Sequence, residues 1–110
     1  MMEPAPLGEF EQLVLLAVLR LGDRAYAIPV RQEIETCAGR SAARGAVYVT
    51  LERLEQKGLL DSRLADGSPQ RGERARRYYR LTPAGLAAVR AARSALLRMW
   101  KGLAPELGPS

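Results

Sequence analysis

Positive charge is concentrated in the segment from Gln70 to Gly85, where the side chains suit phosphate binding. The segment contains five arginines, one glutamate and two adjacent tyrosines: Arg71, Glu73, Arg74, Arg76, Arg77, Tyr78, Tyr79 and Arg80. A guanidinium group binds phosphate through two parallel hydrogen bonds and can enter a narrow DNA minor groove. Because isolated exposed charges add little to stability, we interpret the cluster as part of a surface for a polyanion.

The charge of the whole chain is consistent with this interpretation. The 110 residues have a formal net charge of +5. Within residues 1–12, by contrast, the charged side chains are all acidic: Glu3, Glu9 and Glu11. The region from Arg63 to Arg80 holds six arginines against two acidic residues. Since a hydrophobic fraction of 47% is sufficient for a packed core, the sequence predicts a globular domain with a locally basic surface.

Residues for catalysis and metal binding are scarce. The chain has no histidine and one cysteine, and it shows neither a glycine-rich phosphate loop nor a metal-ligand spacing. We therefore expect no enzymatic activity, no cofactor and no metal. Cys37 is interpreted as a small apolar residue near a helix end, and it allows no intramolecular disulfide. The longest apolar run, Leu13–Leu19, is too short to span a bilayer, so we expect a cytoplasmic protein without membrane contact.

Hydrophobic spacing predicts three short helices ahead of the basic segment. They cover the residues that end at Gly22, about Ala27–Ala38 and about Arg44–Lys57. In the second helix, the residues expected to share the inward face are Val30, Ile34 and Cys37. In the third helix, the inward residues are Val47, Leu51 and Leu54.

The basic segment is predicted to form the second strand of a hairpin and the start of a long helix. Leu59–Leu64 and Arg76–Leu81 flank a turn cluster, and Thr82-Pro83 is a typical N-cap and first turn for a helix over Pro83–Leu103. The expected fold is mainly α with a two-stranded β-wing, a winged helix-turn-helix. Its parts are the DNA-binding domain at 7–82, a dimerisation helix at 83–103, and flexible tails at 1–6 and 104–110.

The N-terminal half of the third helix is the expected base-reading element. Its outward or flanking residues are Arg44, Gly45, Tyr48 and Val49. Gly45 would allow DNA to approach the helix closely, and a packing role for this glycine is the alternative. Tyr48 suits a phosphate contact or a cover for the edge of the core. The wing would add phosphate contacts through Arg71, Arg74, Arg76 and Arg77.

The long C-terminal helix carries more apolar surface than so small a domain can cover. Its apolar stripe comprises Leu86, Val89, Leu96, Leu97, Trp100 and Leu103. We interpret this stripe, together with Phe10 in the first helix, as the interface of a homodimer, with packing inside one chain as the alternative. A two-fold dimer would place two recognition helices on an inverted repeat of double-stranded DNA.

Four segments resemble the PadR family of bacterial transcriptional regulators in its short form: LGEFEQLVLLAVL, AYAIPVRQEIE, GAVYVTLERLEQKGLL and RARRYYRLTPAGL. The resemblance runs from about Leu7 to Trp100. It implies a homodimeric repressor that dimerises through the C-terminal helix, assisted by the first helix. It further implies that the third helix enters the major groove, and that the wing contacts come from Arg74, Arg76 and Arg77.

The resemblance also raises the possibility of a small effector. Some members of the family release DNA when a flat aromatic or phenolic ligand binds between the subunits. Trp100 would stack on such a ligand, with Phe10 and Val14 as walls, and an anchoring role for Trp100 in the dimer interface is the alternative. Two other functions fit the residues: a winged-helix module whose basic hairpin docks an acidic protein, and a ligand-binding scaffold that has little to do with DNA.

Overall fold

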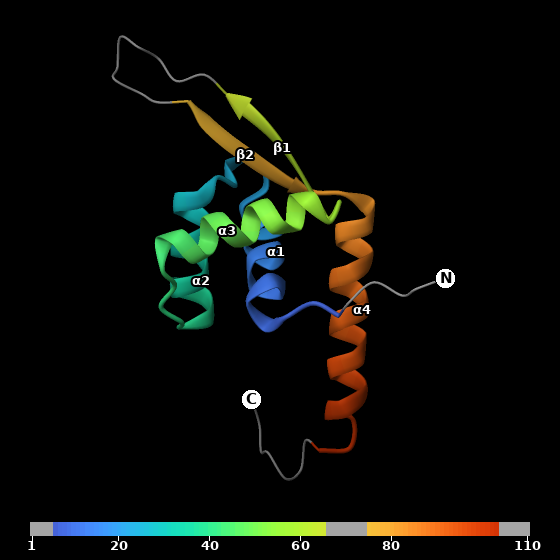
Figure 1. Cartoon of the computed structure of the whole chain (residues 1–110). Helices are drawn as coiled ribbons and strands as arrows, with labels where there is room; N and C mark the ends of the chain where they lie inside the picture. Colours follow the sequence, from blue (N-terminus) through green and yellow to red (C-terminus); the bar gives the residue numbers. More distant parts are fainter. Residues whose placement is uncertain (1–5, 66–74, 104–110) are drawn as a thin grey trace.

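The computed structural model describes residues 6–65 and 75–103. Its elements are α1 (Glu9–Leu21), a single 3-10 turn (Gly22–Arg24), α2 (Ala27–Ala38), α3 (Arg44–Gln56), β1 (Leu60–Ala65), β2 (Arg76–Leu81) and α4 (Pro83–Trp100). Figure 1 shows α1, α2 and α3 grouped together, the hairpin extending away from them and α4 running along one side. The predicted class, mainly α with a two-stranded antiparallel wing, is confirmed. The turn cluster at 66–69, Arg71, Arg74 and most of both tails lie outside the described residues.

The core is built around α1, which packs on both α2 and α3. Its largest fully buried side chains are Val14, Leu15, Val18, Val30, Val47, Leu51, Leu54 and Leu60. The inward face predicted for α3 is therefore confirmed. The prediction for Cys37 is wrong: Val30 and Ile34 are buried, but Cys37 is exposed because the last turn of α2, from Glu35 onward, is exposed throughout.

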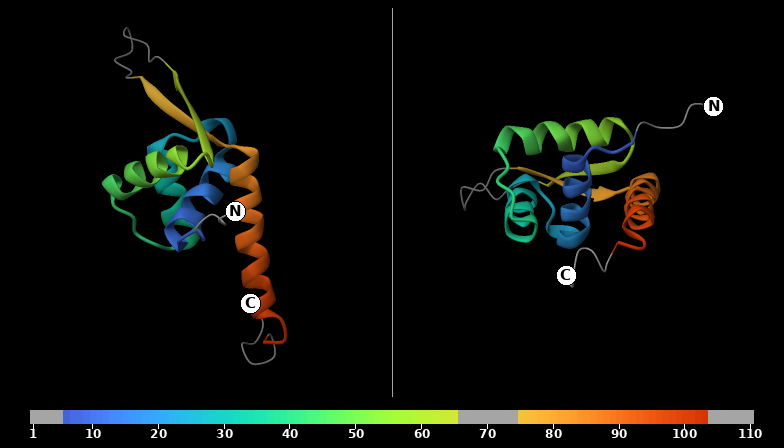
Figure 2. Two further views of the ribbon diagram at one scale, coloured as in Figure 1. Left: turned by 45° about the vertical axis from the view of Figure 1, so that its right-hand side comes forward. Right: turned by 90° about the horizontal axis from the view of Figure 1, so that it is seen from below.

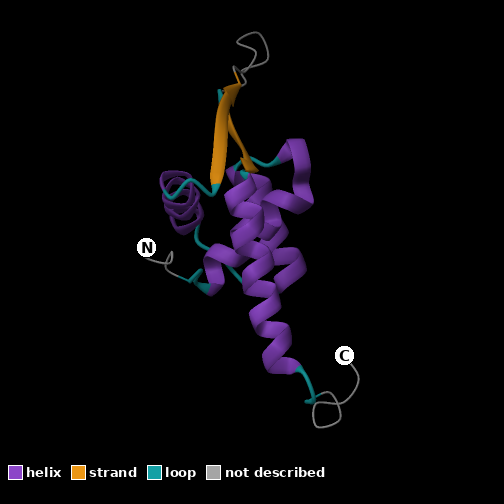
Figure 3. Cartoon of the chain, turned by 90° about the vertical axis from the view of Figure 1, so that its right-hand side faces the viewer, coloured by secondary structure: helices purple, strands orange, loops and turns teal. Residues whose placement is uncertain are grey.

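The hairpin is anchored to the helices at its base and leaves them toward its tip, as Figure 3 shows. β1 and β2 are antiparallel with Leu60 opposite Leu81 and Ser62 opposite Tyr79. Tyr79 is buried and its backbone N–H donates to the Ala25 carbonyl at 2.8 Å, which ties β2 to the connection before α2. Leu64 is 58% exposed because the strands have by then left the helical group. Since two strands alone are marginally stable, this anchoring holds the wing in place.

α4 begins inside the domain and ends outside it. Thr82 is its N-cap, as predicted, and its Oγ1 accepts a hydrogen bond from the Gly85 N–H at 3.0 Å. Gly85 and Val89 are the buried residues of this helix, and Figure 2 shows the second half of α4 extending past the helical group. The helix ends at Trp100 rather than at Leu103, because Gly102 turns the backbone with a φ of 85°.

Candidate nucleic-acid interface

The N-terminal half of α3 presents its side chains outward. Arg44, Tyr48 and Val49 are all exposed, the last two at 46% and 53% of their surface. A Cβ added at Gly45 would have no described heavy atom of the chain within 4 Å, and the φ of Gly45 is not positive. Packing and backbone strain within the described residues therefore do not require a glycine there. The prediction that these four residues face outward is confirmed.

The first turns of α2 and α3 are open to an anion. Neither helix has a side-chain hydrogen bond at its N-cap, which is Tyr26 in α2 and Ala43 in α3, and neither has an acidic residue in its first turn. By contrast, α1 has Glu9 and Glu11 there. The free N–H groups and partial positive charge of such helix starts attract negative charge. The electrostatics of α2 and α3 therefore favour phosphate.

A small cleft of about 160 Å³ lies between α2 and α3 and joins these two helix starts. Its lining includes Ile28, Gln32, Arg44 and Tyr48. The neighbouring Arg31 fixes the turn between the helices, because its Nε donates to the Ala42 carbonyl at 2.7 Å. Ile28 is 49% exposed, and sequence spacing did not single it out. Basic, amide and apolar side chains thus lie together at the cleft between α2 and α3, and the Arg31 hydrogen bond fixes the relative position of the two helices.

The two described wing arginines predicted to bind DNA lie on opposite faces of the hairpin. The Arg76 guanidinium carbon lies 4.5 Å from the centroid of the Tyr26 ring. Arg77 Nη1 donates to Ser62 Oγ at 2.9 Å, and Ser62 Oγ donates to Glu55 at 2.6 Å. Both arginines are exposed. The structure places them beside α2 and α3 respectively, and the partnership with Tyr26 had no signal in the sequence.

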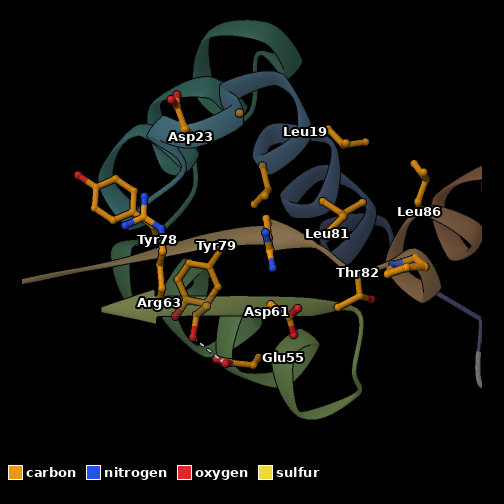
Figure 4. A pocket seen from close by; sticks show the side chains of 15 residues that line it. Leu19, Asp23, Glu55, Asp61, Arg63, Tyr78, Tyr79, Leu81, Thr82 and Leu86 are labelled. Carbon is orange, nitrogen blue, oxygen red and sulfur yellow. Dashed lines mark hydrogen bonds between the residues drawn. The ribbon is translucent and has the colours of Figure 1, made fainter. Parts of the chain in front are cut away.

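A larger hollow of about 900 Å³ is lined by the wing, the end of α1 and the start of α4, and its side chains are shown in Figure 4. Apolar side chains, including Leu19 and Leu86, share its lining with Arg63 and Arg80. Three carboxylates, those of Asp23, Glu55 and Asp61, line it as well. Because these acids oppose the arginines, this hollow is a poorer phosphate site than the surface around α3.

The residues predicted for the dimer interface divide into exposed and buried sets. On α4, Leu96, Leu97 and Trp100 are exposed by half or more, and Leu103 is exposed just beyond the helix end. On α1 and α4, three further large apolar residues are exposed and were not in the prediction: Leu16, Leu19 and Met99. Leu86 is half-buried and Val89 lies in the core of the chain itself. The second half of α4 thus forms an apolar surface that the described residues of the chain leave exposed.

Two of the three residues predicted for an effector site have partners within the chain. Val14 is 0% exposed in the core, so its prediction as a wall of an open ligand site is wrong. Phe10 is half-buried against the core, and the Arg40 guanidinium lies 5.4 Å from its ring centroid. Trp100 is 55% exposed. The sequence pattern placed Val14 on the apolar face of α1. It could not show which residues of that face are fully buried in the chain's own core and which remain exposed.

Glu33 and Cys37 in α2 are ionisable groups with partners inside the chain. Glu33 binds Arg20 Nε at 2.6 Å and accepts from Cys37 Sγ at 3.1 Å, and this hydrogen bond, followed by burial, raises the pKa of the Cys37 thiol. Burial raises the pKa of Tyr79.

The described residues contain no group of three acidic, cysteine or histidine side chains that could hold a metal ion. None of the helices in that part of the chain is long and apolar enough to cross a membrane.

Comparison with known proteins identifies relatives of the chain. The model of the Transcriptional regulator PadR-like family matches residues 15–91. Transcriptional regulator Rv3488 of Mycobacterium tuberculosis is 48% identical over 60 residues, which cover 53% of this chain and 50% of the relative. The match therefore spans about half the length of that curated protein.

Solved structures show the same fold. The crystal structure of a PadR family transcriptional regulator from Eggerthella lenta has a TM-score of 0.68 at 26% identity, over 93% of this chain and 88% of that one. The complex structure of hsRosR-S1 has a TM-score of 0.65 at 25% identity, over 87% and 78% of the two chains. Because the family model covers well over half of the sequence and the fold agrees, the chain belongs to the PadR-like family of transcriptional regulators, which are non-enzymatic DNA-binding proteins.

Proposed function

We propose that the protein is a transcriptional repressor that binds an inverted-repeat operator as a homodimer, with α3 in the major groove. The observation that carries the proposal is the start of α3, where exposed Arg44, Tyr48 and Val49 surround an open Gly45. That helix start also lacks a side-chain cap and an acidic residue. A surface of this kind suits simultaneous contact with base edges and phosphate.

The proposed roles differ along this surface. Arg44 and Val49 contact bases, since arginine pairs with guanine and an apolar side chain fits the thymine methyl group. Tyr48, Arg76 and Arg77 contact phosphates, which positions the protein without selecting sequence. Arg71 and Arg74 lie outside the described residues. Both are proposed as wing contacts because arginines are concentrated in this segment, and for Arg74 the family resemblance supports the same role.

The dimer is supported by the exposed apolar half of α4. A second copy would cover Leu96, Leu97 and Trp100, which are exposed within one chain. The resulting two-fold axis would set two α3 helices about one turn of DNA apart, roughly 34–36 Å. We extend the proposal to release of DNA by a flat aromatic or phenolic effector that stacks on Trp100 between the subunits.

The experiment that tests DNA recognition is selection of bound duplexes from a random pool, read by sequencing. We expect enrichment of an inverted repeat, and a fall in affinity of roughly 10³–10⁵ between 50 and 200 mM salt if 6–10 phosphates are contacted. Arg76→Ala combined with Arg77→Ala should weaken binding to all sequences alike, whereas changes at Arg44 or Val49 should alter preference. If no sequence is enriched, the repressor proposal fails; binding to an acidic protein instead would favour the wing as a protein-docking module.

The dimer is tested by a charge placed on the apolar surface of α4. Leu97→Glu should raise the dimer dissociation constant by about 100-fold or more, measured by analytical ultracentrifugation, because a carboxylate would be buried in the interface. Ala95→Glu is the matched control, since two helical positions turn the side chain to roughly the opposite side of α4. Equal effects of the two changes would contradict an interface on the apolar face.

The effector proposal has its own test, because Trp100 is the single tryptophan of the chain. A phenolic acid that stacks on Trp100 should quench its fluorescence and lower the affinity for the selected operator at the same concentration. Trp100→Leu should abolish the response of operator binding to the ligand. Release of DNA that persists in Trp100→Leu would place the effector elsewhere.

A further inference from the structure

Four side chains from three elements form a connected group at the outer part of the wing. The Tyr26 and Tyr78 rings meet edge to face, with centroids 5.4 Å apart and an interplanar angle of 63°. The Arg76 guanidinium lies 4.5 Å from the Tyr26 centroid, and the Arg63 guanidinium lies 5.0 Å from the Tyr78 centroid. We call these four residues the tyrosine–arginine stack. Tyr26 comes from the start of α2, Arg63 from β1, and Tyr78 and Arg76 from β2.

The stack lies where the hairpin has little other support. Arg63 pairs with Tyr78 across the two strands, and Arg76 pairs with Ala65 at the outermost described position of the ladder. Among the described residues, the outermost backbone hydrogen bond between the wing and the connection before α2 is made by Tyr79. On the other face of the strands, Leu64 is largely exposed. On this face of the hairpin, Tyr26 links the described outer wing to α2, while on the opposite face Arg77 is linked to Glu55 of α3 through Ser62.

The geometry leaves the stacked arginines able to bind an anion. An arginine that stacks on an aromatic ring uses the face of its guanidinium group, and the N–H donors point outward in the plane. Arg63 and Arg76 are both exposed. The ring restricts each side chain to a smaller set of conformations, so less entropy is lost when the arginine binds phosphate. Stacking and phosphate binding are thus compatible at the same arginine.

The stack is also next to the surface proposed to bind DNA. Ala27 and Ile28, which follow Tyr26 directly, line the cleft that Arg44 and Tyr48 line from α3. The first turn of α2 has no acidic residue beside Tyr26, whereas Asp23 and Asp61 line the hollow that Arg63 and Tyr78 also line. Phosphate bound beside α3 would therefore lie along the side of the molecule that carries Tyr26.

We propose that Tyr26 and Tyr78 are positioning residues for DNA binding, which hold Arg76 and Arg63 so that both arginines contact phosphate beside the recognition helix. The inference rests on the proposed function, since it concerns the DNA complex. It adds Arg63 to the phosphate-contacting residues and gives Tyr26 a role through Arg76 rather than through its own hydroxyl. Tyr26 thereby sets the position of the wing relative to α3.

A double-mutant cycle tests this proposal with the full-length protein and a random-sequence duplex. Tyr26→Leu keeps an apolar side chain but removes the ring, and Arg76→Ala removes the cation. We expect each single change to weaken binding about three- to tenfold. The double variant should bind the duplex no less tightly than the single variant with the lower affinity. Tyr26→Phe should retain wild-type affinity because it keeps the ring. The cycle of Tyr26→Leu with Arg77→Ala is the control, and it should be additive since Arg77 lies on the opposite face.

The salt dependence of binding separates positioning from a loss of folded protein. The slope of log affinity against log salt should fall by about 0.9 for each phosphate that the variant no longer neutralises, equally in Tyr26→Leu and Arg76→Ala. Partial unfolding would lower the amount of active protein but leave the slope unchanged. Additive losses in the Tyr26–Arg76 cycle, an unchanged slope in Tyr26→Leu, or equal damage from Tyr26→Phe would each overturn the inference. Absence of DNA binding by the wild type would refute the proposed function as well, and that outcome is recognised before any variant is compared.

Discussion

α3 and α4 carry the two surfaces proposed to bind DNA and a second copy of the chain, and the two helices differ in how their first turns are capped. At the start of α4, Thr82 Oγ1 accepts from the Gly85 N–H and donates to the Gly58 carbonyl at 2.7 Å. At the start of α3, Ala43 offers no side-chain oxygen, so the first N–H groups have no side-chain cap. The start of α4 is therefore satisfied within the chain, whereas the start of α3 is left for an external acceptor.

The glycines in these two turns make the same distinction. A Cβ at Gly85 would lie 2.0 Å from the Leu59 carbonyl oxygen. The backbone of α4 therefore packs directly against the turn between α3 and β1, with no space for a side chain at Gly85. A Cβ at Gly45 would enter open space within the described chain. Packing within the chain requires a glycine at position 85 but not at position 45, where the proposed contact with DNA would explain it. The difference can be tested by the same substitution at both positions.

The largest effect is expected for Gly85→Ala. The new methyl group would force α4 away from Leu59, which should lower the free energy of unfolding by about 1–3 kcal/mol despite the better helix propensity of alanine. Urea denaturation followed by circular dichroism measures this loss. Stability equal to the wild type would show that the close approach of α4 to Leu59 is easily relaxed.

Removal of the cap comes next. Thr82→Ala should cost about 0.5–2 kcal/mol, because the Gly85 N–H loses its acceptor and the Gly58 carbonyl loses its donor. The reverse change at α3, Ala43→Ser, should raise stability by up to about 1 kcal/mol through a new cap. Thermal unfolding of both variants checks the pair. A loss of stability in Ala43→Ser would contradict the view that the start of α3 lacks a satisfied cap.

Gly45→Ala should have opposite effects on stability and on DNA binding. Alanine should stabilise α3 by up to about 1 kcal/mol, since nothing described in the chain opposes the methyl group. If DNA approaches the helix closely there, operator affinity should fall about five- to tenfold, measured by fluorescence anisotropy. An unchanged affinity would remove Gly45 from the proposed interface while leaving its structural description intact.

The smallest change in stability is expected at the start of α1. Its first turn contains the acidic residues Glu9 and Glu11, whereas the first turn of α3 contains none. Burial raises the pKa of Glu11, but hydrogen bonds from Lys57 Nζ at 2.7 Å and from the Gly8 N–H outweigh it and lower the pKa below its usual 4.5. A carboxyl whose pKa is lowered by folding stabilises the folded state above about 4.5, and the contribution is lost as the pH falls through the folded pKa.

Glu11→Gln should therefore be slightly less stable than the wild type at neutral pH, and the two should converge as the pH falls below 4.5. Urea denaturation at several pH values measures the difference. A difference that is constant with pH would mean that packing of the side chain, rather than its charge, is responsible.

The sequence predicted the elements of this protein and singled out α3 as the proposed recognition helix. Helical spacing predicted which residues of α3 are buried, and Thr82-Pro83 marked the start of α4. These are local properties, because they follow from side chains within one or two turns of each other.

Contacts between distant residues were decided only by the tertiary structure. The same pattern of spacing could not distinguish Gly85, where an added Cβ would collide with Leu59, from Gly45, where an added Cβ would meet no described neighbour outside its own helix. Nor could it separate Val14 in the core from the exposed Leu16 on the same helix. The partnership of Tyr26 with Arg76 joins residues fifty positions apart, and only the docking of the wing on α2 brings them together. Local spacing specifies a helix face, but what covers that face depends on where the rest of the chain lies.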